Sequence, residues 1–263
     1  MNNKNNFKPK EHFVALFDVL GFRNMLKQSA NPRNSKEMLE NLSYSYKEVF
    51  IKTWHERKNN NFPKPRLLFF SDTIFSCYVC DEKDKFEYYI KYLSDVMSYF
   101  LACGLQKDEW GNIVVDFPLR GALSFGDIVL FNEFDKAEPG EYINSPLIMG
   151  VPIVDAYDWE RDQKWLGVSV VPQKRSCLKE TYDPSLLIEN HYLVEYDVPK
   201  EKGTEKTLVL NYISTDNIDS VRRYITSQIG RYEEMPDINK KYLETLKFVE
   251  YVHNHKYYLV KEA

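Results

Sequence analysis

The sequence predicts an α+β fold built on one mostly antiparallel sheet, and three observations support this prediction. Short apolar runs typical of strands alternate with longer stretches in which apolar residues recur at helical spacing. Two pairs of these runs are separated only by a short polar turn, which is typical of antiparallel hairpins. The chain has 263 residues, of which 43% are hydrophobic and 15% aromatic, so it can bury a sizeable and largely aromatic core.

The first half of the chain is expected to run strand, helix, helix, hairpin, helix. The first strand ends at a Leu20-Gly21 turn, and Ser35 is a suitable N-cap for the second helix. Apolar residues at helical spacing from Phe86 onward predict the third helix. In order, the expected elements are a strand at 12–18, helices at 22–29 and 35–55, strands at 66–71 and 73–80, and a helix at 86–105.

The second half is expected to add a further hairpin and more helices. Gly126-Asp127 is typical of a turn between two strands, Pro152 suits the first turn of a helix, and Pro236 divides two C-terminal helices. In order, the expected elements are strands at 117–125 and 127–132, a helix starting near 152, strands at 168–171, 192–196 and 206–212, and two helices between 216 and 255.

This order of elements indicates a known type of architecture. Its nearest simple relative is the β-α-β-β-α-β unit of ferredoxin-like folds, so we expect a palm-type, mostly antiparallel sheet with helices on one face. The predicted organisation is a disordered N-terminus at 1–10, one domain at 11–213, and a helical C-terminal extension at 214–263.

Composition and charge exclude several classes of protein. The net charge is −4 and no basic stripe is present, which argues against a nucleic-acid binder. The polar N-terminus lacks the apolar core of a signal peptide, and no run is long and apolar enough for a membrane span. Cys77-x-x-Cys80 has no second cysteine pair or nearby histidine, so we interpret both as ordinary thiols of a reducing compartment. We therefore expect a cytoplasmic protein that contacts neither membranes nor nucleic acid.

Two aspartates lie at the ends of strand-like runs. Asp18 follows the apolar run 13–17, and Asp72 lies between the runs 67–70 and 74–79. Two carboxylates about 4 Å apart repel each other by roughly 4 kcal/mol at an effective dielectric near 20, and a bound divalent cation turns this repulsion into attraction. The pair therefore predicts a cation site. The alternative is that Asp18 caps the helix after Gly21 and that Asp72 only forms a hairpin turn.

Four motifs in order carry a resemblance to a known family. They are Asp18-Val19-Leu20-Gly21-Phe22, Ser71-Asp72-Thr73, the strand from Leu119 to Asp127, and Gly150 to Tyr157. Together they resemble the metal loops, the Arg-x-Gly strand and the closing helix of class III nucleotidyl cyclases, over about residues 12–170. Among these enzymes, the chain is most similar to the bacterial pyrimidine cyclases of phage-defence operons.

The resemblance implies a two-metal active site. Asp18 and Asp72, with the backbone carbonyl of Val19, would hold two Mg²⁺ or Mn²⁺ ions. One ion would activate the ribose 3′-hydroxyl, and the other would bind the triphosphate and stabilise the leaving pyrophosphate.

The resemblance also implies nucleotide contacts. Backbone N–H groups of Gly21, Phe22 and Arg23 would bind phosphate oxygens at a helix N-terminus. Arg120 would be catalytic through a forked phosphate contact, although it is also placed for a cross-strand ion pair. Tyr157 would stack on the base, or be an ordinary helix residue.

The sequence departs from the purine-specific members of the family. The Asn and Arg that they carry on the closing helix are replaced by Val154 and Asp158, and the lysine that reads adenine is replaced by Leu68. The base is therefore a pyrimidine held differently, or catalysis has been lost. Candidates to replace the missing positive charge are Arg161, Lys164, Lys200 and Lys202.

The expected function is that of a nucleotidyl cyclase. It would convert an NTP, with UTP or CTP favoured, to a 3′,5′-cyclic nucleotide and pyrophosphate, as a homodimer that makes a second messenger in anti-phage defence. A separate effector protein would sense the product. The alternative is a catalytically degenerate nucleotide-binding or regulatory module. A palm-type enzyme that makes dinucleotides is less favoured, because the sequence lacks the Gly-Gly-Asp/Glu-Glu-Phe loop of that class.

Overall fold

The computed structural model describes most of the chain. The described residues are 9–22, 36, 40, 46, 49–57, 64–79, 83–102, 118–131, 147–172 and 183–260.

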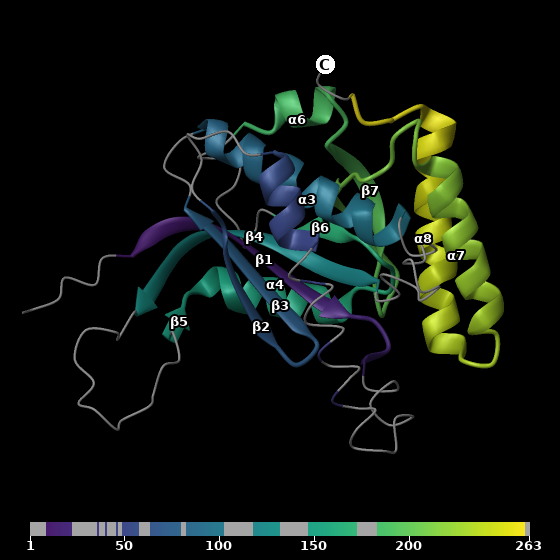
Figure 1. The fold of residues 1–263 in the computed structure, drawn as a ribbon, viewed down its shortest axis with the longest axis horizontal. Helices are drawn as coiled ribbons and strands as arrows, with labels where there is room; N and C mark the ends of the chain where they lie inside the picture. Colours follow the sequence, from purple (N-terminus) through teal and green to yellow (C-terminus); the bar gives the residue numbers. More distant parts are fainter. Residues whose placement is uncertain are drawn as a thin grey trace, which may run out of the picture.

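The strands within the described residues form a single eight-stranded sheet (Figure 1). Its order is β2-β3-β1-β4-β6-β8-β7, with β5 paired to the end of β4. Every pairing is antiparallel except that of β4 with β6. The strands are β1 (Lys10–Val19), β2 (Arg66–Phe70), β3 (Thr73–Val79), β4 (Leu119–Phe131), β5 (Leu147–Met149), β6 (Val168–Val170), β7 (Leu193–Pro199) and β8 (Thr204–Leu210). The predicted α+β class with a mostly antiparallel sheet is confirmed.

Four of the five helices below lie close to predicted ranges, whereas the short helix α6 was not predicted. The helices are α3 (Lys83–Ala102), α4 (Val151–Asp162), α6 (Ser185–Glu189), α7 (Ile218–Arg231) and α8 (Pro236–His255). Residues 49–56 are also helical and belong to the helix predicted at 35–55. The helix predicted at 22–29 falls almost entirely outside the described residues, and so does Cys80.

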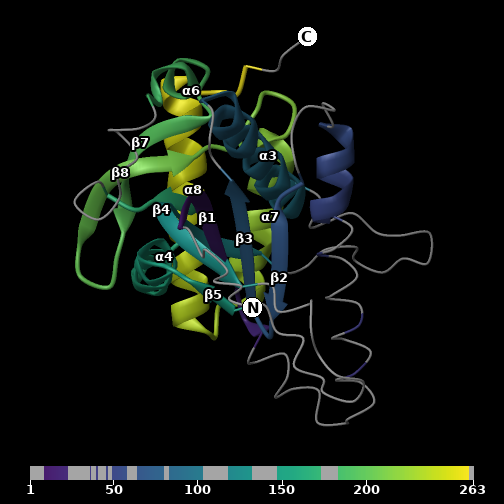
Figure 2. The same cartoon turned by 90° about the vertical axis from the view of Figure 1, so that its left-hand side faces the viewer.

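The two faces of the sheet carry different helices, as the alternation of side chains along β1 shows. Phe13 and Phe17 join the main core together with α3, which contributes the buried Phe86. Val14 and Leu16 point the other way and pack in a smaller cluster against α4. In Figure 2, α3 and α4 accordingly lie on opposite sides of the central strands. Helices therefore cover both faces, whereas the sequence led us to expect them on one.

Strand β4 corrects one sequence prediction, because no hairpin forms at Gly126-Asp127. The strand continues through both residues and pairs with β1 from Leu119 to Ile128. Gly126 has a φ of 149°, and a Cβ atom at this position would come within 3.0 Å of the Pro152 side chain. The glycine therefore allows the start of α4 to approach the strand closely, which is a common role of glycine inside a strand.

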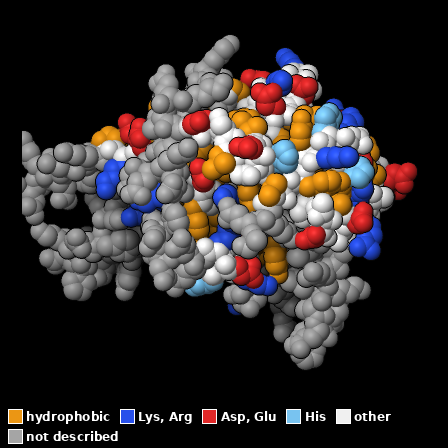
Figure 3. All heavy atoms as spheres, turned by 90° about the horizontal axis from the view of Figure 1, so that it is seen from above, with side chains coloured by type: hydrophobic (Ala, Val, Ile, Leu, Met, Phe, Trp, Pro, Cys, Tyr) orange, Lys and Arg blue, Asp and Glu red, His pale blue; other side chains and the backbone are white. Residues whose placement is uncertain are grey.

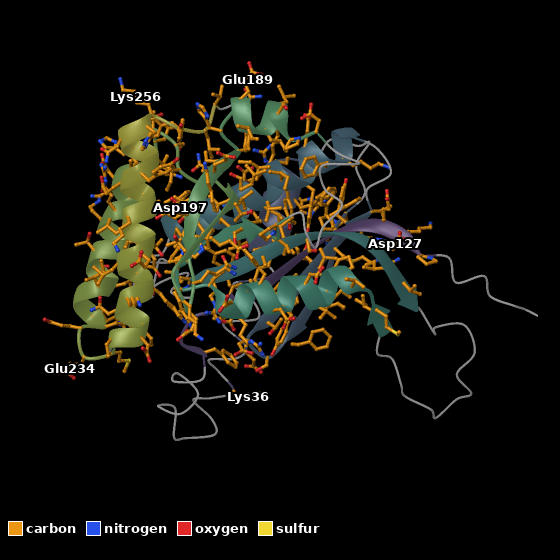
Figure 4. All side chains as sticks on the ribbon, turned by 180° about the vertical axis from the view of Figure 1, so that it is seen from behind. Lys36, Asp127, Glu189, Asp197, Glu234 and Lys256 are labelled. Carbon is orange, nitrogen blue, oxygen red and sulfur yellow. The ribbon has the colours of Figure 1, made fainter. Side chains whose placement is uncertain are left out.

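The C-terminal helices α7 and α8 run side by side as a hairpin at one end of the sheet (Figure 1). Figure 4 marks the hairpin at Glu234, between the two helices, and at Lys256, where α8 ends. Tyr224 of α7 and Phe248 of α8 are fully buried in the same core as β1. The predicted helical extension therefore shares its core with the sheet. The domain boundary at residue 214 stays a prediction.

The distribution of charged side chains on the surface agrees with the absence of a basic stripe in the sequence. Figure 3 views the end of the molecule near α6, where acidic, basic, histidine and hydrophobic side chains of the described residues are mixed rather than sorted into a basic stripe. Among the described helices, none combines the length and the apolar character that a bilayer crossing requires.

Candidate functional site

The structure brings Asp18 and Asp72 together at the ends of the neighbouring strands β1 and β3. Asp18 lies opposite Thr73 in the β1–β3 pairing, and the next backbone N–H, that of Val19, donates to the carbonyl of Asp72 at 2.9 Å. The negative charge of Asp72 also contributes to raising the pKa of Asp18, after the larger effect of burial. The charge of Asp72 therefore acts on Asp18, although the two residues are distant in sequence.

Asp72 occupies a tight turn, as the simpler interpretation of this residue predicted. Phe70 pairs with Thr73, so only Ser71 and Asp72 connect β2 to β3. Ser71 adopts a φ of 55°, a conformation that glycine adopts more easily. Turn formation and proximity to Asp18 are both properties of Asp72, so its place in the turn does not decide between the two interpretations.

Arg120 lies between Asp18 and helix α4. It faces Asp18 across the β1–β4 pairing, with its Nη2 3.1 Å from Asp18 Oδ2. Its Nη1 donates to the carbonyl of Gln163 at 3.0 Å, and its Nε forms an ion pair with Glu160. The cross-strand ion pair is therefore present. A phosphate contact stays a prediction, and it would require Arg120 to exchange one of these partners.

Burial shifts the pKa values of the ionisable groups around Arg120. Desolvation raises the pKa of Asp18, although the charge of Arg120 opposes this effect. Desolvation also raises the pKa of Glu160 to about 7, again against the opposing effect of Arg120. On α8, burial followed by repulsion from Arg120 lowers the pKa of Lys241 to about 8. Asp18, Arg120, Glu160 and Lys241 therefore form one electrostatic cluster, to which four separate elements, β1, β4, α4 and α8, each contribute one residue.

A buried hydrogen-bond network holds the end of α4 in place. Gln163 is fully buried, and its Nε2 donates to the carbonyl of Gly121 at 2.8 Å. Its Oε1 accepts hydrogen bonds from Trp165 Nε1 at 2.9 Å and from Ser169 Oγ at 2.5 Å. Because the side chain of Gln163 is fixed in this way, its carbonyl is a well-defined acceptor for Arg120.

The turn after β1 has the backbone geometry that its glycine predicts. Gly21 has a φ of 82°, which is favourable for glycine and costly for other residues. The preceding N–H, that of Leu20, donates to the carbonyl of Pro118 at 3.0 Å, and Phe22 is buried. Arg23 lies outside the described residues. Phosphate binding by this turn stays a prediction.

Tyr157 lies on the outer side of α4. Its side chain is 49% exposed, and the guanidinium of Arg161 lies 5.6 Å from the centre of its ring. Ala156 and Trp159 are among the residues of this helix that pack against the sheet. Tyr157 lies on the exposed side of α4, and its role in base stacking stays a prediction.

The four positively charged residues proposed to replace the missing arginine are either paired with other residues or exposed. Arg161 lies 3.8 Å from Asp158, and Lys164 pairs with Glu201. The ammonium of Lys200 lies 3.1 Å from the ring centre of Trp159 and 3.4 Å from Asp162. Lys202 is exposed in the turn between β7 and β8.

Sequence reasoning missed Glu160 and Lys241. A signal existed for Glu160, because helical spacing places it on the same side of α4 as Ala156 and Trp159, where a carboxylate needs a partner. For Lys241 the spacing of α8 indicates only a position beside the buried Thr245. No feature of the sequence indicates that this side of α8 reaches Asp18.

The donor set fits a hard divalent cation. Asp18, Asp72 and the nearby backbone carbonyls offer oxygen ligands only, which suit Mg²⁺ and Mn²⁺. Within the described residues there is no group of three or more His, Cys, Asp or Glu side chains that could hold a metal by themselves. Mg²⁺ sites are often completed by substrate phosphates and water rather than by protein alone, so two carboxylates are a sufficient protein contribution.

Glu160 makes the stability of the protein depend on pH. Its pKa is about 7 in the folded protein, above the ordinary value of 4.5. Its contribution to stability is therefore fully present below pH 4.5 and is lost as the pH rises through 7. We expect the free energy of unfolding of the wild type, relative to that of Glu160→Gln, to fall between these pH values, as measured by urea denaturation.

The control for this prediction is Glu189→Gln on α6, where the glutamate is exposed. This variant should follow the wild type across the whole pH range. A constant difference between the wild type and Glu160→Gln would show that folding leaves the pKa of Glu160 unchanged, and would contradict the prediction.

Comparisons with known proteins give a fold likeness only. No family model matches the chain, and no curated protein matches it. Among solved structures, the guanylyl cyclase Cya2 is similar with a TM-score of 0.49 and 12% identity, over 77% of this chain and 91% of that chain. A class III adenylyl cyclase-like ATP-binding protein from Pseudomonas aeruginosa is similar with a TM-score of 0.44 and 16% identity, over 62% of this chain and 33% of that one. At these values neither likeness establishes a family or an activity for this chain.

Proposed function

We propose that this chain is a nucleotidyl cyclase that converts an NTP, with UTP or CTP favoured, to a 3′,5′-cyclic nucleotide and pyrophosphate. We further propose that it uses two Mg²⁺ or Mn²⁺ ions and that its product is a second messenger in anti-phage defence, read by a separate effector protein. The observation that supports this proposal is the meeting of Asp18 and Asp72 at adjacent strand ends. Both aspartates lie in motifs that resemble the two metal loops of class III cyclases.

The proposed roles follow from where each group lies. Asp18 and Asp72 would hold the metal ions, which when bound lower the pKa of the ribose 3′-hydroxyl and stabilise the leaving pyrophosphate. Arg120 would act as a positioning residue, because its contacts with Glu160 and Gln163 hold its guanidinium against the Asp18 carboxylate. The turn at Gly21 would present backbone N–H groups to the phosphates.

A homodimer is part of the proposal. Several hydrophobic side chains of β5 and α4 are exposed side by side, and such a patch is often covered by a partner. They are Met149, Val151, Val154 and Tyr157, with exposed fractions of 54%, 69%, 60% and 49%. The mass in solution, measured by light scattering, checks this part of the proposal independently of activity.

A second candidate function is a cyclase-like module that binds a nucleotide without chemistry. Two observations favour it. Asp158 occupies the place of the arginine that class III purine cyclases use in the transition state, and all three side-chain nitrogens of Arg120 have protein partners. This alternative predicts metal-dependent NTP binding with no turnover.

Incubation with nucleotides separates the two candidates. The purified chain is incubated with each of the four NTPs and Mn²⁺, and pyrophosphate and cyclic products are measured. The cyclase proposal expects a cyclic nucleotide from UTP or CTP and an equal amount of pyrophosphate. Folded protein that binds NTP but makes no product from any of the four would support the binding module instead.

A further inference from the structure

Lys241 enters the candidate site from the C-terminal hairpin. It lies on the side of α8 that approaches the sheet. One helical turn further along α8, Thr245 is hydrogen-bonded to the segment that follows α4. There Leu166 N–H donates to Thr245 Oγ1 at 2.8 Å, and Thr245 Oγ1 itself donates to the carbonyl of Lys241 at 2.7 Å. The ammonium of Lys241 interacts electrostatically with Asp18, Arg120 and Glu160. Helix α8 is therefore fixed with this lysine beside the carboxylates.

The positive charges around Asp18 are not equivalent. Arg120 has three protein partners, in Asp18, Glu160 and Gln163. By contrast, among the residues that the structure describes, no hydrogen bond or ion pair engages the ammonium of Lys241. A half-buried lysine in such a place has lost part of its hydration without a direct counter-ion, and burial correspondingly lowers its pKa. Its charge is thus available to a ligand.

We propose that Lys241 is a positioning residue of this site, which weakens the binding of a free divalent cation and strengthens the binding of a polyphosphate anion. The inference rests on the proposed function, because it takes Asp18 and Asp72 as cation ligands and a triphosphate as the anion. It assigns the C-terminal hairpin to the site. It also identifies Lys241, rather than Arg161, Lys164, Lys200 or Lys202, as the cation that acts on Asp18 in addition to Arg120.

The two effects have opposite signs for a simple reason. A fixed positive charge repels an incoming Mn²⁺ ion and attracts a triphosphate, and both interactions are strong at a half-buried site of low effective dielectric. Removing the charge should tighten the first interaction and weaken the second. Loosening of the fold would instead weaken both, so the pair of measurements distinguishes an electrostatic role from a structural one.

The experiment compares the wild type with Lys241→Met, Lys241→Arg and the control Lys240→Met. Lys240 is the neighbouring lysine on α8 and is exposed. Calorimetry measures the binding of Mn²⁺ alone, and separately the binding of a preformed Mn²⁺–tripolyphosphate complex, which needs no knowledge of the base. Thermal unfolding of each variant reports whether the fold is retained.

We expect Lys241→Met to bind Mn²⁺ about three- to tenfold more tightly, and the tripolyphosphate complex more weakly by a similar factor. Lys241→Arg should restore both affinities, and Lys240→Met should change neither. The inference is overturned if Lys241→Met matches Lys240→Met, if both affinities of Lys241→Met fall together, or if the wild type binds neither probe. A wild type that binds both probes but turns over no NTP would sink the cyclase proposal and leave this inference standing.

Discussion

Replacing Asp18 with asparagine should abolish cyclic nucleotide formation without lowering stability. We expect a loss in turnover of about a thousandfold or more, equivalent to about 4 kcal/mol of transition-state stabilisation, because a neutral amide is a poor ligand for a hard cation. Burial raises the pKa of Asp18 in the folded protein, so its ionised form is less favourable there than in the unfolded chain. The asparagine removes this cost. Product formation by chromatography and urea denaturation at pH 7.5 check the two expectations.

Two further variants show whether the loss of activity is specific to the proposed metal site. Asp72→Asn should lose activity to a similar extent, and Asp197→Asn, on an exposed position of β7 marked in Figure 4, should be unaffected in both measurements. The capping interpretation of Asp18 predicts the reverse pattern. It expects asparagine, itself a good N-cap, to preserve activity, and Asp18→Ala to destabilise the protein by about 1 kcal/mol.

Replacing Arg120 with methionine should destabilise the protein by about 3–5 kcal/mol, because it leaves the buried Glu160 and the partly buried Asp18 without their shared partner. The Arg120 side chain is only 11% exposed, so water cannot take over its role easily. Urea denaturation measures the change, and Arg161→Met is the control, since the Arg161 side chain is 68% exposed.

A double variant tests the cause of this loss. Arg120→Met combined with Glu160→Gln removes one of the two uncompensated charges, so part of the lost stability should return. If the double variant is as unstable as the sum of the two single variants, the two residues are not coupled, and the loss at Arg120 comes from packing rather than from charge.

The sequence was sufficient to predict most strands of the sheet, although not β5 (Leu147–Met149), and the meeting of Asp18 with Asp72. Alternating apolar residues and short turns define strands locally, and both aspartates lie at strand ends, which antiparallel pairing brings together. The wrong prediction of a hairpin at Gly126-Asp127 also came from a local signal. The dipeptide is a local turn signal, but the long pairing of β4 with β1 and the approach of Pro152 keep the strand continuous.

The charged surroundings of Asp18 could not be predicted in the same way. Glu160 and Lys241 reach the site because α4 covers the second face of the sheet and because α8 is anchored at Leu166. Both facts depend on tertiary packing of elements far apart in the chain, and helical periodicity indicates only which side of each helix turns inward. The position of Tyr157 on the outer side of α4 was hidden for the same reason.

The most direct test of the account is a crystal structure with Mn²⁺ and the α,β-methylene analogue of the nucleotide that is turned over or bound most tightly. Anomalous scattering locates manganese without reference to the protein. The account predicts manganese peaks about 2.1 Å from carboxylate oxygens of both Asp18 and Asp72, with phosphate oxygens completing the coordination. Nucleotide bound elsewhere, or manganese bound away from these two aspartates, would contradict it.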